Sequence, residues 1–324
     1  MRQSELLEQS TEPFSPTTEE SAYPSITTNQ NSVTPSGTEM ITPPQVEGTC
    51  AKCETTSSQD NNKQDIVPRS FVYGLGKIEA RFPTLSAEKE FAQATGRSKT
   101  TGLTDKQTLS TVLSAKENRY LVRQLCWVFS IEGIETYILY PRDPSDFDLL
   151  ITALRQNPSP LDMDVVIGFL GPVAPPEMCN GLMVPILVFD QIYSLDRDAL
   201  MQSIPKPNDI AKSSFKAVAE ELFEKLIQLT DNAGAMDEHR AVNYLAVRYP
   251  AIYAKAAEVF EQNASLTAVD VKPSPLSGVR KVVDVIFSYT NRTTDMTEKF
   301  FVRVDVTEEF PFLTKKLSPY FDRE

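Results

Sequence analysis

The spacing of apolar residues divides the chain into an irregular first part and a patterned remainder. In residues 1–67, apolar side chains stand singly among Ser, Thr, Pro, Glu, Gln and Asn, without a helical or strand period. Such a segment buries too little apolar surface to offset its loss of conformational entropy on folding. We therefore expect a disordered arm over residues 1–67, with order beginning near Arg69.

Beyond the arm, apolar alternation and runs of β-branched or aromatic residues predict strands. These cover residues 70–81, 124–130, 135–140, 163–170, 182–192, 266–271, 282–289 and 299–306. Glu132 and Gly133 form the turn of a hairpin, and Pro185 favours an edge position or a bulge for its strand. The apolar residues of 310–321 stand between prolines and predict an irregular coil.

Helical periodicity and capping residues predict helices between these strands. The expected helices cover 87–96 after a Ser86 cap, 104–113, 143–155, 196–203 and most of 213–263. Hairpins with segregated helices indicate the α+β class. The Pro- and Gly-rich residues 171–181 suggest a boundary between two subdomains that could be related, 68–174 and 175–324.

Composition narrows the possible partners and the compartment. The 324 residues carry a formal charge of -12 and no dense Lys/Arg run, so we expect neither nucleic acid nor a membrane as partner. No apolar stretch approaches the length of a membrane span, and Met1–Glu8 lacks the hydrophobic region of a signal peptide. We expect a cytoplasmic protein whose four cysteines are thiols.

The arm carries a CxxC pair, Cys50 and Cys53, at a spacing that can hold one side of a tetrahedral zinc site. Zinc requires two further ligands, and the sequence has no second CxxC and one histidine. We expect no cofactor and thiols without a dedicated role. Zinc shared across a dimer, or an oxidisable pair, stays as an alternative.

Candidate catalytic residues are few. His239, beside Glu238 at a predicted helix start, could act as a general base, and Cys179 could be a nucleophile. Polar residues at a helix start more often cap the helix or face solvent. The pair Gly74 and Gly76 lacks the remainder of a phosphate loop, so it predicts a bulge or a close approach of two backbones.

Two further groups of side chains have binding and structural interpretations. Acidic residues gather at 143–148 and at Asp162 and Asp164, where carboxylates could bind a divalent cation or, in the first group, favour a helix start. Trp127, Tyr137 and Tyr140, in the first predicted hairpin, could line a peptide groove. We favour core positions for the aromatic residues of this hairpin.

Four long segments of the chain resemble one known family. They are Phe71–Arg97, Asn118–Tyr140, Pro175–Tyr193 and Asp284–Pro311. These segments are similar to the C-terminal domain of the PatG family of cyanobactin maturation proteases. The resemblance covers roughly residues 70–322 and implies an accessory domain of unknown function, so it transfers no catalytic residue.

Proteases of that family carry a subtilisin-like domain that cleaves and macrocyclises a ribosomal precursor peptide. A subtilisin site requires a Ser/His/Asp constellation. This sequence has one histidine and no GTSM motif, so we expect no such activity. We expect a non-catalytic interaction module that binds a precursor peptide, a maturation protease or a second copy of itself. The alternatives are an enzyme of unrecognised type and a zinc-linked assembly module.

Overall fold

The computed structural model describes residues 70–98, 100–155, 159, 161–204, 212–229 and 231–321. Its elements form two sheets, one closed and one open, together with helices, so the predicted α+β class is confirmed. The predicted arm lies outside the described residues. No described helix is long and apolar enough to cross a membrane.

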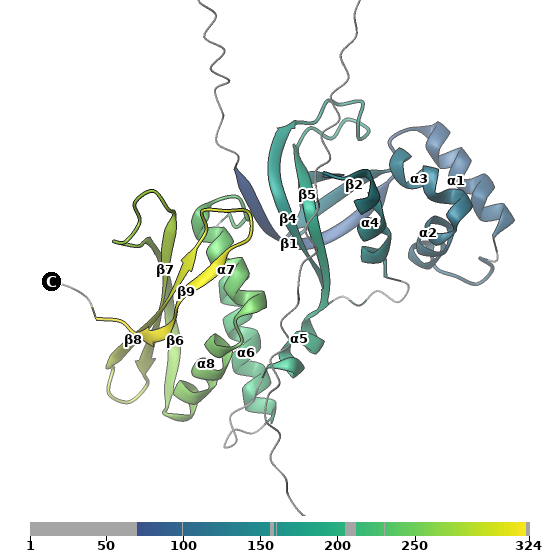
Figure 1. Ribbon diagram of the computed structural model, residues 1–324. Helices are drawn as coiled ribbons and strands as arrows, with labels where there is room; N and C mark the ends of the chain where they lie inside the picture. The colour runs from purple at the N-terminus through teal and green to yellow at the C-terminus, as the bar shows by residue number, and fades with distance from the viewer. Residues whose placement is uncertain are drawn as a thin grey trace, which may run out of the picture. The chain divides into compact units, whose positions relative to one another are not determined.

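The first sheet is a closed five-stranded barrel (Figure 1). Its strands are β1 (Phe71–Arg81), β2 (Cys126–Ile131), β3 (Ile134–Pro141), β4 (Asp162–Val173) and β5 (Pro185–Asp196). They follow one another around the barrel in the order β1-β2-β3-β5-β4, and β3 runs parallel to β5. This Greek-key order is that of the OB-fold.

Helices close the barrel and extend its core. Between β1 and β2 lie α1 (Leu85–Arg97), α2 (Asp105–Ser114), η1 (Lys116–Asn118) and α3 (Arg119–Gln124), and between β3 and β4 lie η2 (Pro144–Asp146) and α4 (Phe147–Ala153). Inward side chains such as Trp127, Phe129 and Phe189 pack with Leu113 and Leu150 from these helices. Thr104 caps α2, as predicted, and also forms a capping box with Gln107, whereas Thr84 and not Ser86 caps α1.

The second sheet is open and has the strand order β6-β7-β8-β9. Its strands are β6 (Ala264–Pro273), β7 (Val282–Asn291), β8 (Thr297–Asp305) and β9 (Phe312–Pro319). Helices α6 (Lys212–Ile227), α7 (Asp237–Arg248) and α8 (Ala251–Glu261) lie against this sheet (Figure 1). The short helix α5 (Arg197–Ser203) precedes them.

One apolar cluster joins the barrel to these helices and to the second sheet. Tyr73 and Val165, which point out of the barrel, pack in the same cluster as Phe223 on α6, Leu245 on α7 and Phe287 on β7. The predicted faces of 282–289 and 299–306 supply the sheet side of this cluster. Burial on both sides of the helices therefore holds the two sheets in one folded unit.

The structure corrects two sequence expectations about strands. The segment 182–192 is no edge strand, because β5 pairs with β3 on one side and with β4 on the other. Pro185 stands at its first residue, where a missing N–H is tolerated, and the β4–β5 register shifts between Leu170 and Val173 beside it, in agreement with the expected bulge. Residues 312–319 form a strand and not a coil, because the prolines at 311 and 319 flank a segment that pairs with β8.

The expected boundary at residues 174–175 falls in the connection between β4 and β5, which are paired neighbours in the barrel.

The expected close approach of glycines is confirmed. A Cβ on Gly76 would lie 2.3 Å from the carbonyl oxygen of Ser130, and one on Gly74 would lie 2.7 Å from the ring of Phe129. These glycines let β1 pass over β2 and the Phe129 ring.

Candidate functional site

Strand β1 changes its partner in the middle. Residues Phe71–Gly76 pair with β4, and residues Lys77–Arg81 pair with β2. The pairing of β1 with β4 ends at Gly76 opposite Asp164, and Asp162 and Met163 of β4 pair with β5 alone, so beyond Gly76 the edge of β1 that faces away from β2 has no paired strand. A short open edge therefore exists inside an otherwise closed barrel.

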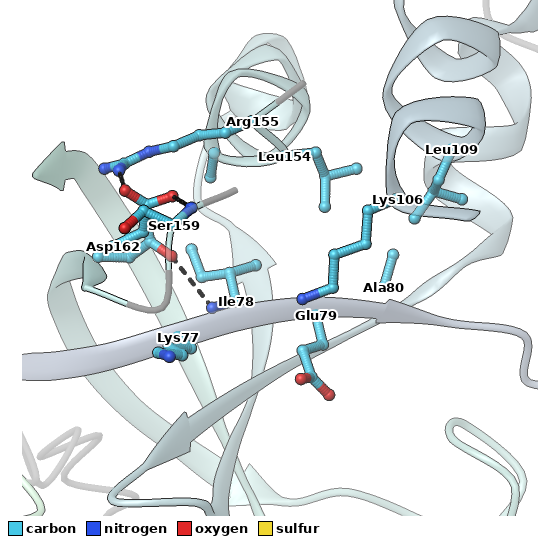
Figure 2. Close-up of a pocket in the computed structure, with 12 residues that line it drawn as sticks. Lys77, Ile78, Glu79, Ala80, Lys106, Leu109, Leu154, Arg155, Ser159 and Asp162 are labelled. Atoms are coloured by element: carbon cyan, nitrogen blue, oxygen red, sulfur yellow. Dashed lines mark hydrogen bonds and ion pairs between the residues drawn. The ribbon is translucent and has the colours of Figure 1, made fainter. Parts of the chain in front are cut away.

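A pocket of about 310 Å³ lies along this open edge (Figure 2). Its volume is at the lower end of the range for small-ligand sites. The walls come from β1, α2, the end of α4 and the start of β4. The lining residues are Lys77, Ile78, Glu79, Ala80, Lys106, Leu109, Ala153, Leu154, Arg155, Ser159, Asp162 and Asp164.

The buried carboxylate of Asp164 accepts a hydrogen bond from the first backbone N–H on the open edge of β1, that of Ile78. Asp164 Oδ2 accepts the N–H of Ile78 at 3.1 Å, and Asp164 Oδ1 accepts the hydroxyl of Ser194 at 2.7 Å. Only 8% of Asp164 is exposed. Burial raises the pKa of this carboxyl above its usual value, while the two hydrogen bonds act in the opposite direction. Asp164 thus takes the place that a strand partner would occupy beside Ile78.

The next donor on this edge is the N–H of Ala80. Backbone groups of a strand alternate between its two edges, so the N–H of Ala80 points to the same side as that of Ile78. Outside the strand ladders, no group among the described residues accepts a hydrogen bond from it, and its direction places it on the side away from β2. The pocket therefore presents an available backbone donor beside the apolar side chains of Leu109 and Leu154.

Charged side chains surround this apolar floor. Arg155 forms an ion pair with Asp162, which also accepts the N–H of Ser159 at 2.6 Å. Lys106 extends from α2 toward β1 (Figure 2), and among the described residues its ammonium has no ion-pair partner. The pocket can therefore offer a carboxylate-bearing ligand a cation at its rim.

The pocket lacks the full set of residue types that a Ser/His/Asp site requires. Its lining includes one serine, Ser159, and neither histidine nor cysteine. A Ser/His/Asp arrangement therefore cannot form from the lining residues. Asp162 and Asp164, considered above as possible cation ligands, are engaged with Arg155 and with Ile78 and Ser194.

The structure places the candidate catalytic residues in two different environments. His239 and Glu238 lie in α7, and His239 is buried (3% exposed), so it does not face solvent. Cys179 packs on the outer face of the barrel and forms a disulfide with Cys126. The expectation of free thiols is wrong for these two cysteines, because the barrel brings their Cα atoms to 5.5 Å across a separation of 53 residues.

The aromatic candidates divide between core and surface. Trp127 and Tyr137 are buried (1% and 3% exposed), and each donates a hydrogen bond to a backbone carbonyl, that of Val122 and that of Ala233. Their predicted core role is confirmed. Tyr140 is 52% exposed, so the core position expected for it is wrong, and among the three it is the one whose ring a peptide can reach without rearrangement.

The CxxC pair Cys50 and Cys53 lies outside the described residues, and zinc binding there stays a prediction. Among the residues with described positions, no group of three His, Cys, Asp or Glu side chains is arranged to hold a metal ion.

Sequence reasoning missed the open edge itself. The residues that create it, Ile78 and Ala80, are apolar and carry no local signal of a binding role.

Comparison with known proteins gives two matches that agree with each other. Residues 209–320 match the family model described as PatG C-terminal. Among solved structures, the one titled PatG Domain of Unknown Function matches with a TM-score of 0.63 and 18% sequence identity. That match covers 78% of this chain and 98% of the other.

At 18% sequence identity, the match to the solved structure shows similarity of fold alone. No curated protein matches the sequence significantly. The family match covers helices α6 to α8 and the second sheet, and the structural match covers more of the chain than this part. The chain therefore contains a PatG C-terminal-like domain over residues 209–320, as the resemblance of its sequence segments predicted.

Proposed function

We propose that this chain is a non-catalytic module of ribosomal peptide maturation that binds an extended segment of a precursor peptide. The proposal rests on the open edge of β1 at Ile78–Ala80. This edge forms one wall of a pocket whose other walls carry the apolar side chains of Leu109 and Leu154. Peptides that add a strand to an open sheet edge gain main-chain hydrogen bonds, and neighbouring pockets select their side chains.

The pocket suits a short segment. An extended residue spans about 3.4 Å, so the stretch from Ile78 to Ala80 can pair with a few residues of a peptide. The N–H and C=O of Ala80 would supply the main-chain bonds, while Leu109 and Leu154 would contact an apolar side chain. Lys106 favours a peptide that carries a carboxylate near this point.

The family context supplies the class of ligand. Residues 209–320 match the PatG C-terminal model, and the family that the sequence resembles consists of proteases that act on ribosomal precursor peptides. The pocket contains no nucleophile–histidine pair, which supports binding without covalent change. Presentation of the peptide to a separate maturation enzyme would then be the role of the module.

A proline substitution tests the edge directly. Ala80→Pro removes the N–H that points into the pocket and leaves the ladder with β2 intact, because the Ala80 N–H points away from β2. Overlapping precursor peptides labelled with fluorescein would be titrated against both proteins, with binding followed by anisotropy. We expect Ala80→Pro to weaken binding at least about tenfold, the effect of one lost hydrogen bond plus steric exclusion.

Ala80→Ser is the matched control, because it alters the side chain and keeps the N–H. It should bind as the parent does. Equal binding by parent and Ala80→Pro would move the peptide site elsewhere. A change in peptide mass after incubation would show that the chain is an enzyme. Absence of peptide binding, combined with binding of a maturation protease, would assign the module to protein assembly.

A further inference from the structure

A loop covers the outer face of the barrel on the side away from the helices of the second sheet. Three outward side chains, Val128 on β2, Ile138 on β3 and Ile186 on β5, form a row across paired strands. Residues 174–184, which connect β4 and β5, lie over this row and are called the cover loop below. Its packed side chains are Ala174, Met178, Cys179, Leu182 and Val184.

One covalent bond attaches the tip of the cover loop to β2. Within the described structure, the backbone hydrogen bonds of the loop are internal, as from Ala174 N to Val184 O (2.9 Å) and from Leu182 N to Cys179 O (3.0 Å). Contact with β2 and β3 rests on apolar packing and on the Cys126–Cys179 disulfide. Four partly or fully exposed residues, Pro175, Pro176, Glu177 and Asn180, make the rest of the loop poor in buried contacts.

The disulfide borders a route to solvent. A pocket of about 260 Å³ is lined by Arg81, Phe82, Glu135, Cys179, Asn180 and Leu182. Cys179 contributes to its wall, and Cys126 does not. Both cysteines are buried (Cys179 4% and Cys126 3% exposed), and Cys179 is the one of the two that borders this pocket.

We infer that Cys126–Cys179 is a site of thiol–disulfide exchange with a dithiol reductant, and that its reduction releases the cover loop from the barrel. A thiolate of the dithiol attacks Sγ of Cys179, the bond between the two cysteine sulfurs breaks, and Cys126 leaves as a thiolate that takes up a proton. The second thiol of the dithiol then attacks the mixed disulfide. Cys179 leaves as a thiol, and the dithiol is oxidised to its cyclic disulfide.

The position of the loop gives this step a consequence for binding. In OB-fold barrels the outer face of strands 2 and 3, between the loops β1–β2 and β4–β5, is the common ligand face. Here the β4–β5 loop itself occupies that face while the disulfide is intact. The oxidation state of two cysteines thereby decides whether Val128 and Ile138 are covered, independently of the pocket beside β1.

Hydrogen exchange of the full chain tests the inference. The background is the Cys50→Ser/Cys53→Ser variant, so that Cys126 and Cys179 are the only cysteines. Alkylation with and without dithiothreitol, followed by mass spectrometry, first measures the disulfide in the native protein. Exchange of the amides in 176–184 is then compared with that of β7, before and after reduction.

We expect reduction to accelerate exchange in the cover loop at least about tenfold and to leave β7 unchanged. Further replacement of Cys126 and Cys179 by Ser should reproduce the reduced pattern without reductant. Free thiols before reduction, resistance of the native disulfide to dithiothreitol, or unchanged loop exchange would each overturn the inference. Faster exchange in β7 as well would also overturn it, because the disulfide would then support the whole fold.

Discussion

Asp164 Oδ2 accepts the backbone N–H of Ile78 at 3.1 Å, so a side chain occupies a position where the barrel lacks a strand. The edge of β1 would otherwise leave two successive N–H groups without protein partners at this point. Natural sheets commonly protect such edges with charges or with covering segments. Asp164 protects half of the edge and leaves the Ala80 donor facing the pocket.

Replacing Asp164 tests how much this contact stabilises the barrel. Asp164→Ala should lower the free energy of unfolding by about 1–3 kcal/mol, because Ile78 N–H and Ser194 Oγ lose a buried acceptor. Asp164→Asn retains an acceptor oxygen and should cost less. Urea unfolding measures both. An equal loss in the two variants would show that the negative charge, and not the acceptor, is what matters.

Gly76 should be intolerant of any side chain. A Cβ there lies 2.3 Å from the carbonyl oxygen of Ser130, and backbone cannot move aside as a side chain can. Gly76→Ala should therefore destabilise the protein by about 1–3 kcal/mol in urea unfolding. Gly96→Ala is the matched control, because a Cβ at that helical position meets nothing within 4 Å. It should be neutral or stabilising by up to about 1 kcal/mol.

Local patterns predicted most elements, and long-range pairing accounts for what they missed. Alternation in 282–289 identified β7, and the spacing of Phe215, Ala219, Leu222 and Leu226 identified the buried face of α6. Local chemistry cannot show that β3 pairs in parallel with β5, because the partners lie about 48 residues apart (138 and 186). That pairing removed the expected edge at 182–192 and brought Cys126 to Cys179.

The candidate site was the least predictable part for the same reason. Its open edge arises where β1 exchanges β4 for β2, a consequence of barrel closure that leaves no mark in residues 78–80. Strand β9 was missed because the prolines at 311 and 319 suggested a coil, while its pairing depends on β8. Asp162 and Asp164 were noticed as a pair, although their roles as acceptors required the fold.

Arg240 should be the most sensitive charged residue of α7. It is 2% exposed, and its guanidinium donates to the carbonyl oxygens of Val306 (2.6 Å), Glu308 and Glu309 (3.2 Å). Burial lowers its pKa to about 10. Arg240→Met should lower the free energy of unfolding by about 2–5 kcal/mol, since several buried carbonyls lose their donor.

Arg240→Lys keeps the positive charge and changes the hydrogen-bonding geometry, so the same unfolding experiment distinguishes the two contributions. An ammonium cannot reproduce the planar fork that serves three carbonyl groups, so this variant should also lose stability, though less than Arg240→Met. Full stability of Arg240→Lys would show that positive charge alone suffices. Full stability of Arg240→Met would show that water can replace the guanidinium.

Glu309 should make stability depend on pH near neutrality. Burial, and then the hydrogen bond and charge of Asp190, raise the pKa of Glu309 to about 7, against the opposing charges of Arg142 and Arg240. Asp190 Oδ2 and Glu309 Oε1 have no donor among the described residues, and a proton held between the two carboxyls would satisfy both. The protonated form therefore belongs to the folded state.

The sign of the effect follows from that raised pKa. The folded chain holds the proton more tightly than the unfolded chain, whose Glu pKa is 4.5, so stability is greatest below that value and is lost as pH rises toward about 7. Melting temperature should accordingly be lower at about pH 8 than at about pH 5.5. Glu309→Gln, which stays neutral and can donate to Asp190, should remove most of this slope and raise stability at about pH 8. Glu308→Gln, a neighbouring change of the same kind, should leave the slope intact, and a slope that persisted in Glu309→Gln would assign the titration to another group.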